Sequence, residues 1–217
     1  MLLDRQRVKF WQRWVFAIMA IIMAGFLVMI PVSGNVGCNG SSSATEQIDK
    51  DIARYEAAVK AAPNDVDTWR LLGESYLARA NQQAQGSAAQ VSDWRSAAVK
   101  YERAITLLAK EKGAAARQLR VDSLDNLVSI YLFLKDYQMA TSVYGQITEL
   151  RPKDAESYFN MATVAIDAGD TNTALLAFTK FLELDPESPD AAAVRDWIAQ
   201  NSTSSSPSPS PSSESGQ

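Results

Sequence analysis

A pattern that recurs after 34 residues constrains this chain more than any other feature of its sequence. Two successive windows, 121–154 and 155–188, carry large apolar, small and proline residues at the same offsets, and six of seven positions agree in character. The first supplies Leu124, Leu127, Tyr131, Tyr137, Ala140, Tyr144 and Pro152, and the second supplies Tyr158, Met161, Ala165, Thr171, Ala174, Phe178 and Pro186. In each half window the apolar positions fall on one face of a helix. Each window therefore predicts a pair of helices.

Incomplete copies of the pattern precede these windows. One begins at Val66 and contains about 12 extra residues around 81–91. Its matching residues are Trp69, Leu72, Gly73, Tyr76, Ala97, Tyr101 and Ala104. An earlier stretch matches a lone second helix through Tyr55, Ala58 and Pro63. The extra residues are predicted either to lengthen the first helix pair or to loop outward.

Together these residues resemble the tetratricopeptide-repeat family, whose pattern is W-x2-L-G-x2-Y followed by A-x3-F/Y-x2-A and a final proline. The resemblance covers about residues 47–186 and departs from the pattern where Val128 and Ala162 replace glycine and Phe181 replaces a small residue. It implies an all-α solenoid of helical hairpins, wound into a right-handed superhelix, in which each hairpin is stable only when stacked on its neighbours. It also implies a protein that binds other proteins and does not catalyse a reaction.

The N-terminal region carries an uncharged apolar run over 15–32. A helix needs about 20 residues to cross a bilayer, so the sequence predicts one transmembrane helix at 14–32 ahead of the solenoid. Basic residues precede the run and none follows it before Lys50, which predicts a cytoplasmic segment at 1–13 and an extracytoplasmic solenoid. The chain thus resembles bacterial membrane-anchored tetratricopeptide-repeat proteins, and its predicted location is the cell membrane, as a single-pass protein.

Two alternatives for this region stay open, namely cleavage near Gly34 and lipidation of Cys38, which would give a secreted or lipid-anchored protein. Gly, Ser and Asn residues at 33–45 predict a flexible linker, and the Ser/Pro-rich stretch 201–217 predicts a disordered tail. The solenoid at 46–200 is predicted to contain a half-repeat at 46–63, repeats at 66–110, 121–154 and 155–188, and a cap helix at 189–200.

The composition removes most catalytic chemistry. The chain has no histidine and one cysteine, so Ser-His-Asp triads, the usual zinc sites and intrachain disulfides are excluded. We therefore expect no catalytic residue, no metal and no cofactor. The acidic pairs Asp122/Asp125 and Glu183/Asp185 are the only candidates for acid–base catalysis, and their repeat positions favour solvated surface charges.

The resemblance implies that the first helix of each hairpin lines a peptide-binding groove. The residues predicted to line it are Asp67, Arg70, Glu74, Asp122, Asp125, Asn126, Ser129, Phe133, Glu156, Phe159, Asn160, Thr163 and Asp167. The two asparagines at equivalent positions are expected to hydrogen-bond a ligand backbone. Because acidic side chains dominate and Arg70 is the one basic member, the groove is predicted to prefer a basic or amphipathic segment. The alternative, that these charges are only solvated, stays open.

The sequence therefore predicts a membrane-anchored scaffold or adaptor that mediates protein–protein interactions on the extracytoplasmic face. The alternative is an assembly or chaperone-like factor for one membrane complex, resembling cytochrome-maturation repeat subunits. Nucleic acid is not an expected partner, because acidic residues outnumber basic ones by 25 to 21 whereas phosphate binding needs clustered Lys and Arg. The sequence specifies neither the partner nor the oligomeric state.

Overall fold

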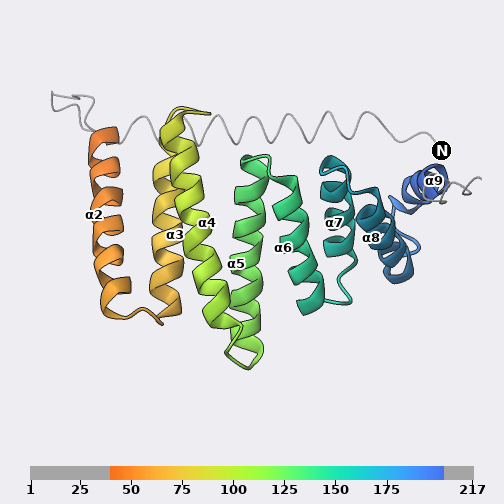
Figure 1. Ribbon diagram of the computed structural model, residues 1–217, viewed down its shortest axis with the longest axis horizontal. Helices are drawn as coiled ribbons and strands as arrows, with labels where there is room; N and C mark the ends of the chain where they lie inside the picture. Colours follow the sequence, from red (N-terminus) through yellow and green to blue (C-terminus); the bar gives the residue numbers. More distant parts are fainter. Residues whose placement is uncertain (1–39, 203–217) are drawn as a thin grey trace, which may run out of the picture. The chain divides into compact units, whose positions relative to one another are not determined.

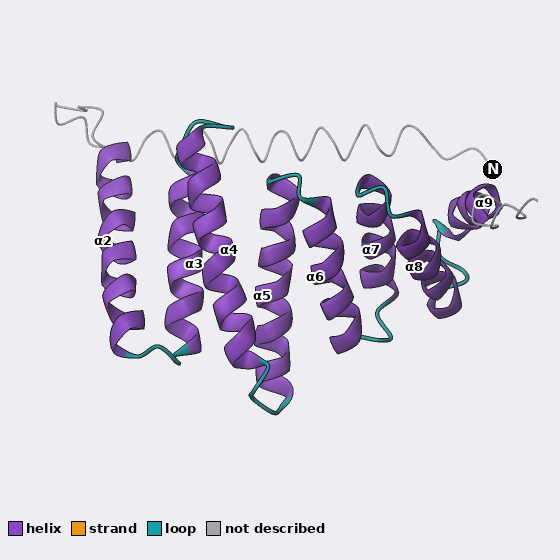
Figure 2. Cartoon of the chain, in the orientation of Figure 1, coloured by secondary structure: helices purple, strands orange, loops and turns teal. Residues whose placement is uncertain are grey.

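The computed structural model describes residues 40–202, and every regular element in that range is an α-helix. The helices are α2 (Gly40–Ala61), α3 (Val66–Asn81), α4 (Ala88–Leu108), α5 (Ala114–Phe133), α6 (Tyr137–Leu150), α7 (Ala155–Asp167), α8 (Thr171–Leu184) and α9 (Ala191–Ser202). Short turns join adjacent ends, so that successive helices from α2 to α8 alternate in direction, whereas α9 is turned away from this row (Figure 1, Figure 2). The predicted all-α fold of helical hairpins is confirmed for these residues.

Two hairpin turns occur where the repeat pattern predicts them. Between α5 and α6, Lys135 has a left-handed φ of 57°, and Asp136 accepts a hydrogen bond from an amide in the first turn of α6 at 3.1 Å. Between α7 and α8, Gly169 has a φ of 74°, and Asp170 caps α8 in the same way at 3.0 Å. The aspartates satisfy amides that a helix start leaves without partners. The two repeats therefore share their turn geometry as well as their apolar pattern.

The extra residues of the first hairpin lengthen it. α3, α4 and α5 have 16, 21 and 20 residues, whereas α6, α7 and α8 have 14, 13 and 14. The insertion predicted at 81–91 forms the turn after α3 and the first residues of α4, where Ser87 accepts a hydrogen bond from the Gln90 amide at 3.1 Å. The α3–α4 turn consequently extends past the end of α5 (Figure 1).

A buried ion pair holds the lengthened hairpin together. Arg79 of α3 donates from Nη2 to Asp93 Oδ1 at 2.7 Å and from Nε to Oδ2 at 2.9 Å. Asp93 is only 5% exposed, so this bidentate pair compensates a charge that is removed from water. Arg79 Nη1 also donates to Asp49 of α2 at 3.0 Å. One side chain therefore joins three helices.

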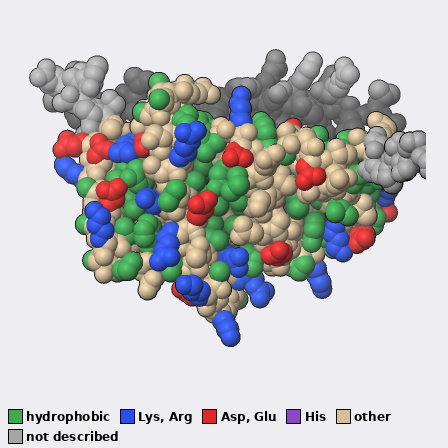
Figure 3. Space-filling view, viewed as in Figure 1, with side chains coloured by type: hydrophobic (Ala, Val, Ile, Leu, Met, Phe, Trp, Pro, Cys, Tyr) green, Lys and Arg blue, Asp and Glu red, His purple; other side chains and the backbone are tan. Residues whose placement is uncertain are grey.

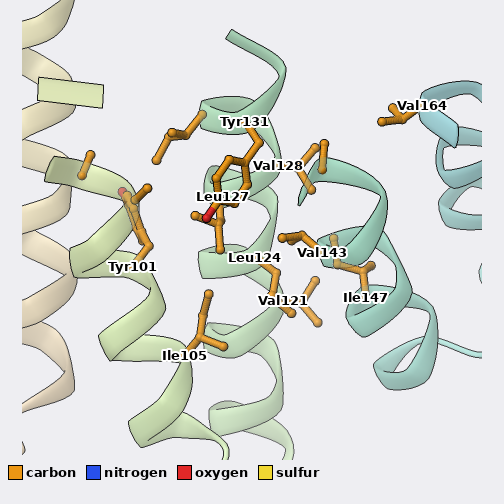
Figure 4. Packing of buried hydrophobic residues seen from close by; sticks show 14 residues of the cluster. Tyr101, Ile105, Val121, Leu124, Leu127, Val128, Tyr131, Val143, Ile147 and Val164 are labelled. Carbon is orange, nitrogen blue, oxygen red and sulfur yellow. The ribbon is translucent and has the colours of Figure 1, made fainter. Parts of the chain in front are cut away.

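The hydrophobic core has three parts, named here by position. The N-terminal core joins α2 and α3 through Ile52, Val59 and Leu72, and the C-terminal core joins α7, α8 and α9 through Ala162, Ala177, Phe178, Phe181 and Val194. The central core lies between them, chiefly on α4, α5 and α6 (Figure 4). Its Tyr101 ring lies against Gly73, where an added Cβ would come within 3.0 Å of Tyr101 Cε2. This close approach explains the small residue that the repeat pattern carries at that position.

α9 covers the C-terminal core. Val194 is buried, and Trp197 and Ile198 pack against the core, whereas Arg195 and Asp196 are exposed. Its helix occupies 191–202, where a cap helix was predicted at 189–200. The predicted disordered tail was therefore placed too early, because its first two residues belong to α9.

The predicted linker at 33–45 also needs correction, because α2 already begins at Gly40. Thr45 donates a hydrogen bond to the side-chain oxygen of Gln82 at 2.6 Å, which joins the early part of α2 to the residue after α3. This long-range contact favours helix over linker, and local composition does not reveal it.

The predicted location at the cell membrane is contradicted: within residues 40–202, no helix is both long and apolar enough to cross a membrane. The longest helices, α2, α4 and α5, each carry several charged residues. The transmembrane helix predicted at 14–32, the cytoplasmic segment at 1–13 and the positions Gly34 and Cys38 lie outside the described residues, as does the segment 203–217.

Candidate peptide-binding surface

Every residue predicted to line a groove lies on α3, α5 or α7, the first helices of the three hairpins. We call this set the groove residues. The exposed members are Asp67, Glu74, Asp125, Ser129, Glu156, Thr163 and Asp167, and the partly buried members are Arg70, Asp122, Asn126, Phe133, Phe159 and Asn160. None is fully buried, so each presents some of its surface to solvent. The structure divides them into a mixed-charge set on α3, an acidic set on α5 and α7, and two aromatic residues.

On α3, two acidic neighbours flank Arg70. Its guanidinium nitrogens lie 3.4 Å from Asp67 Oδ1 and 3.6 Å from Glu74 Oε1. Both carboxylates are well exposed, so these are surface ion pairs of the kind that stabilises little. Since two negative charges face one positive charge, this part of the surface is also slightly acidic.

An acidic cluster lies on and beside α5 and α7. It consists of Asp122, Asp125, Asp154 and Glu156. Desolvation raises the pKa of the Asp125 carboxyl, and the charges of Asp122 and Asp154 raise it further. Arg151 opposes the rise but does not reverse it. Burial is therefore the main cause of the raised pKa, and the two neighbouring carboxylates add to it.

Tyr144 of α6 joins the two sides of the acidic cluster. Burial raises the pKa of its hydroxyl, and the charges of Asp125 on α5 and Glu156 on α7 add to the rise. The hydroxyl therefore lies within electrostatic range of both carboxylates. The structure thus brings groove residues from two repeats together around one phenol.

Three polar groove residues hydrogen-bond to the backbone of their own helix. Asn126 Nδ2 donates to the Asp122 carbonyl at 3.1 Å, and the hydroxyls of Ser129 and Thr163 donate to carbonyls one turn earlier at 3.1 and 3.0 Å. An amide nitrogen carries two hydrogens, so Asn126 keeps one for another acceptor. Its expected contact with a ligand backbone stays a proposal.

The two aromatic groove residues are part of the packed interior. Phe133 stacks on Trp94 of α4, with ring centroids 4.3 Å apart and planes 14° from parallel. Phe159 contacts Phe178 and Phe181 of α8 at centroid distances of 5.7 and 5.2 Å. Contacts with neighbouring aromatic side chains therefore hold both rings in place, and only part of each ring is exposed.

Sequence reasoning missed Tyr144, Asp154 and Arg151. A signal for Tyr144 was present, because it occupies the aromatic position of the second helix in its repeat, as Tyr101 and Phe178 do in theirs. That ring faces the first helix of its own repeat, as the contact of Tyr101 with Gly73 shows. Asp154 and Arg151 flank the α6–α7 turn, where no periodic pattern marks them.

Comparison with known proteins identifies the repeats. Residues 121–154 and 155–188 match the family model named Tetratricopeptide repeat. A crystal structure of MamA is similar over 79% of this chain and 91% of that chain, at 15% identity and a TM-score of 0.46. A fragment of MamA from Desulfovibrio magneticus RS-1 is similar over 78% and 94%, at 14% identity and 0.44. The Cut9–Hcn1 complex of the APC/C is similar over 72% of this chain and 40% of that chain, at 15% identity and 0.39.

Proposed function

We propose that this chain, which carries two adjacent tetratricopeptide repeats, is a protein-interaction scaffold whose groove residues bind a basic or amphipathic segment of a partner. Tetratricopeptide repeats generally bind proteins or peptides and are typically non-catalytic. The acidic cluster carries the charge preference in this proposal. The partner segment would lie along the exposed sides of α3, α5 and α7.

The observation that carries the proposal is the grouping of Asp122, Asp154 and Glu156 around Asp125 and Tyr144, with Arg151 as the opposing cation. The Asp125 carboxylate is held near Asp122 and Asp154 with one opposing arginine, so a cationic side chain placed beside it would relieve repulsion. The Tyr144 hydroxyl beside Asp125 offers a hydrogen-bonding group to the same ligand. The partly exposed rings of Phe133 and Phe159 would contact apolar side chains of an amphipathic segment.

The test compares three fluorescein-labelled peptides of equal length, one rich in Lys and Arg, one rich in Asp and Glu, and one neutral, by fluorescence anisotropy. We expect the basic peptide to bind most tightly and its affinity to fall as salt rises, because the contacts are electrostatic. Replacing both Asp122 and Asp125 with Asn should weaken its binding at least tenfold, which corresponds to about 1.4 kcal/mol.

A matched control removes two exposed negative charges elsewhere, through Glu187→Gln together with Asp196→Asn at the α8–α9 end. This variant has the same net charge as the first, so a loss of affinity in both would reflect overall charge and contradict a local site. Tightest binding of the acidic peptide would also contradict the proposal. Equal binding of all three peptides would mean that the groove charges are only solvated.

A further inference from the structure

The α4–α5 turn carries a group of basic residues that is separate from the groove residues. Lys110 and Lys112 lie in this turn, and Arg117 and Arg120 lie in the first two turns of α5. Among residues 40–202, none of the four makes an ion pair or a side-chain hydrogen bond. Figure 3 shows Lys and Arg side chains gathered at the lower edge of the molecule, where Figure 1 places this turn. Their positive charges therefore have no ion-pair partner in that range, although the chain as a whole has a net charge of −4.

Three of these side chains line a cavity of about 270 Å³. Lys112, Arg117 and Arg120 share it with Glu111 and with apolar atoms of Leu108 and Leu150. The Nε of Arg120 is buried and has no hydrogen-bond partner in the described part of the chain. Because this Nε is closed off from solvent, a ligand in the cavity would contact other atoms of the Arg120 side chain.

The start of α5 lies beside the same cavity, which Gly113 and Arg117 line. Gly113 precedes the helix with a φ of 119° and has no side chain to cap it. The first amide of α5 to bond back along the helix is that of Arg117, which donates to the Gly113 carbonyl at 3.1 Å. The amides at 114–116 therefore lack helical acceptors, and a helix start favours negative charge.

We propose that this cavity binds a phosphoryl group. Three positive side chains and one negative side chain line it, for a net charge of +2. A phosphomonoester carries a charge of about −1.5 to −2 at pH 7 and three acceptor oxygens. The charge of the cavity matches this dianion better than it matches a carboxylate. Guanidinium groups and helix amides are the donors that phosphate oxygens accept most readily.

The experiment follows the 15N–1H resonances of the amides at 113–116 and of the Arg120 side chain in the full-length protein. Inorganic phosphate, acetate and chloride are titrated at matched ionic strength, followed by a peptide that carries one phosphoserine and its unphosphorylated form. We expect saturable shifts of these resonances with phosphate and with the phosphopeptide, and only small unsaturating shifts with acetate and chloride.

Two variants and a control locate the site. Lys112→Gln and Arg117→Gln change exposed residues, so each should fold normally, and the double variant should weaken phosphate binding at least tenfold. Lys153→Gln removes an exposed positive charge at the α6–α7 turn, outside the cavity, and should leave binding within twofold.

Equal shifts with phosphate and acetate would overturn the proposal, as would phosphate binding that the double variant leaves unchanged. Tighter binding of the phosphopeptide than of free phosphate would support the site and assign it to a phosphorylated protein. Tighter binding of free phosphate would support the site and assign it to a small molecule. Each outcome is independent of whether the groove residues bind a basic peptide.

Discussion

At the scale of single residues, three tyrosines on α3, α4 and α5 differ in how their hydroxyls are satisfied. Tyr101 is fully buried, and its hydroxyl has no partner in the described range. Tyr131 donates its hydroxyl to Glu102 Oε1 at 2.5 Å. Tyr76 likewise donates to Glu56 at 2.6 Å, and burial together with this bond raises its pKa to about 12. Tyr101 therefore contributes through its ring alone. Tyr76 and Tyr131 also connect neighbouring helices through their hydroxyls.

We predict that Tyr101→Phe leaves the free energy of unfolding unchanged or raises it by up to about 1 kcal/mol, because a buried hydroxyl without a partner costs stability. Tyr131→Phe should lower it by about 1.5 kcal/mol, since it removes a hydrogen bond to a charged acceptor. Urea unfolding of both variants measures the difference. A clear loss in Tyr101→Phe would mean that water or a ligand satisfies this hydroxyl in solution.

Asp125 gives a prediction about pH. Its folded-state pKa is raised above the ordinary value of 3.8, so the folded state holds the proton more tightly than the unfolded state. As pH rises from about 3.8 through the raised pKa, the free energy of unfolding should therefore fall. Asp125→Asn removes this titrating carboxyl. The stability of the variant relative to the natural chain should therefore rise across that pH window and then stay constant. Urea unfolding between pH 3 and pH 8 measures the trend.

Asp170 is the control of opposite sign. Hydrogen bonds from the Thr173 hydroxyl and amide lower the pKa of the Asp170 carboxyl. The ionised carboxylate therefore stabilises the fold above the unfolded-state pKa, and this stabilisation is lost as pH falls through the folded-state pKa. Asp170→Asn should therefore be less stable than the natural chain at neutral pH, with a deficit that shrinks in acid. If both variants gave the same pH trend, the explanation from local environment would be wrong.

At the scale of helices, charged networks decide how the lengthened hairpin is held. The pair between Arg79 and Asp93 links α3 to α4, and the third contact of Arg79 reaches α2. The pair between Lys180 and Glu183 has the same shortest distance, 2.7 Å, but both of its side chains are exposed and lie on one helix. The first pair is bidentate, joins two helices and has a buried carboxylate, whereas the second is a single exposed contact within one helix.

We predict that Arg79→Met lowers the free energy of unfolding by about 3 kcal/mol, because it leaves the buried Asp93 carboxylate without its cation. Lys180→Met should change it by less than about 1 kcal/mol, as expected for an exposed pair. Urea unfolding measures both variants side by side. Losses of equal size would show that burial of Asp93 does not determine the contribution of its ion pair.

At the scale of the described molecule, stability is divided among three cores along a row of helices. Contacts run mainly between helices that are adjacent in sequence, so no single centre holds the whole row. In such solenoids stability is close to a sum of hairpin and interface terms. Damage at one end should therefore stay near that end.

Trp197→Ala and Trp69→Ala test this division from opposite ends. Trp197 of α9 meets Phe178 edge to face at a centroid distance of 5.2 Å, and Trp69 packs against the N-terminal core. Each ring is only partly buried, so we expect local losses of about 2 kcal/mol, less than for a fully buried ring. Hydrogen exchange should speed up in α7–α9 for the first variant and in α2–α3 for the second. Uniform acceleration in both would mean that the row unfolds as one unit.

The repeat pattern alone determined the hairpins, the turns at 135–136 and 169–170, and the helices that carry the groove residues, because helix pairing in a solenoid depends on contacts close in sequence. Tertiary structure decided the start of α2, the fate of the residues at 81–91, and the meeting of Asp125, Tyr144 and Glu156 from three helices. It also placed Arg120, Lys112 and the start of α5 around one cavity. Periodicity reports which face of a helix is apolar, whereas the electrostatics of a surface depends on distances between side chains that a linear pattern does not contain.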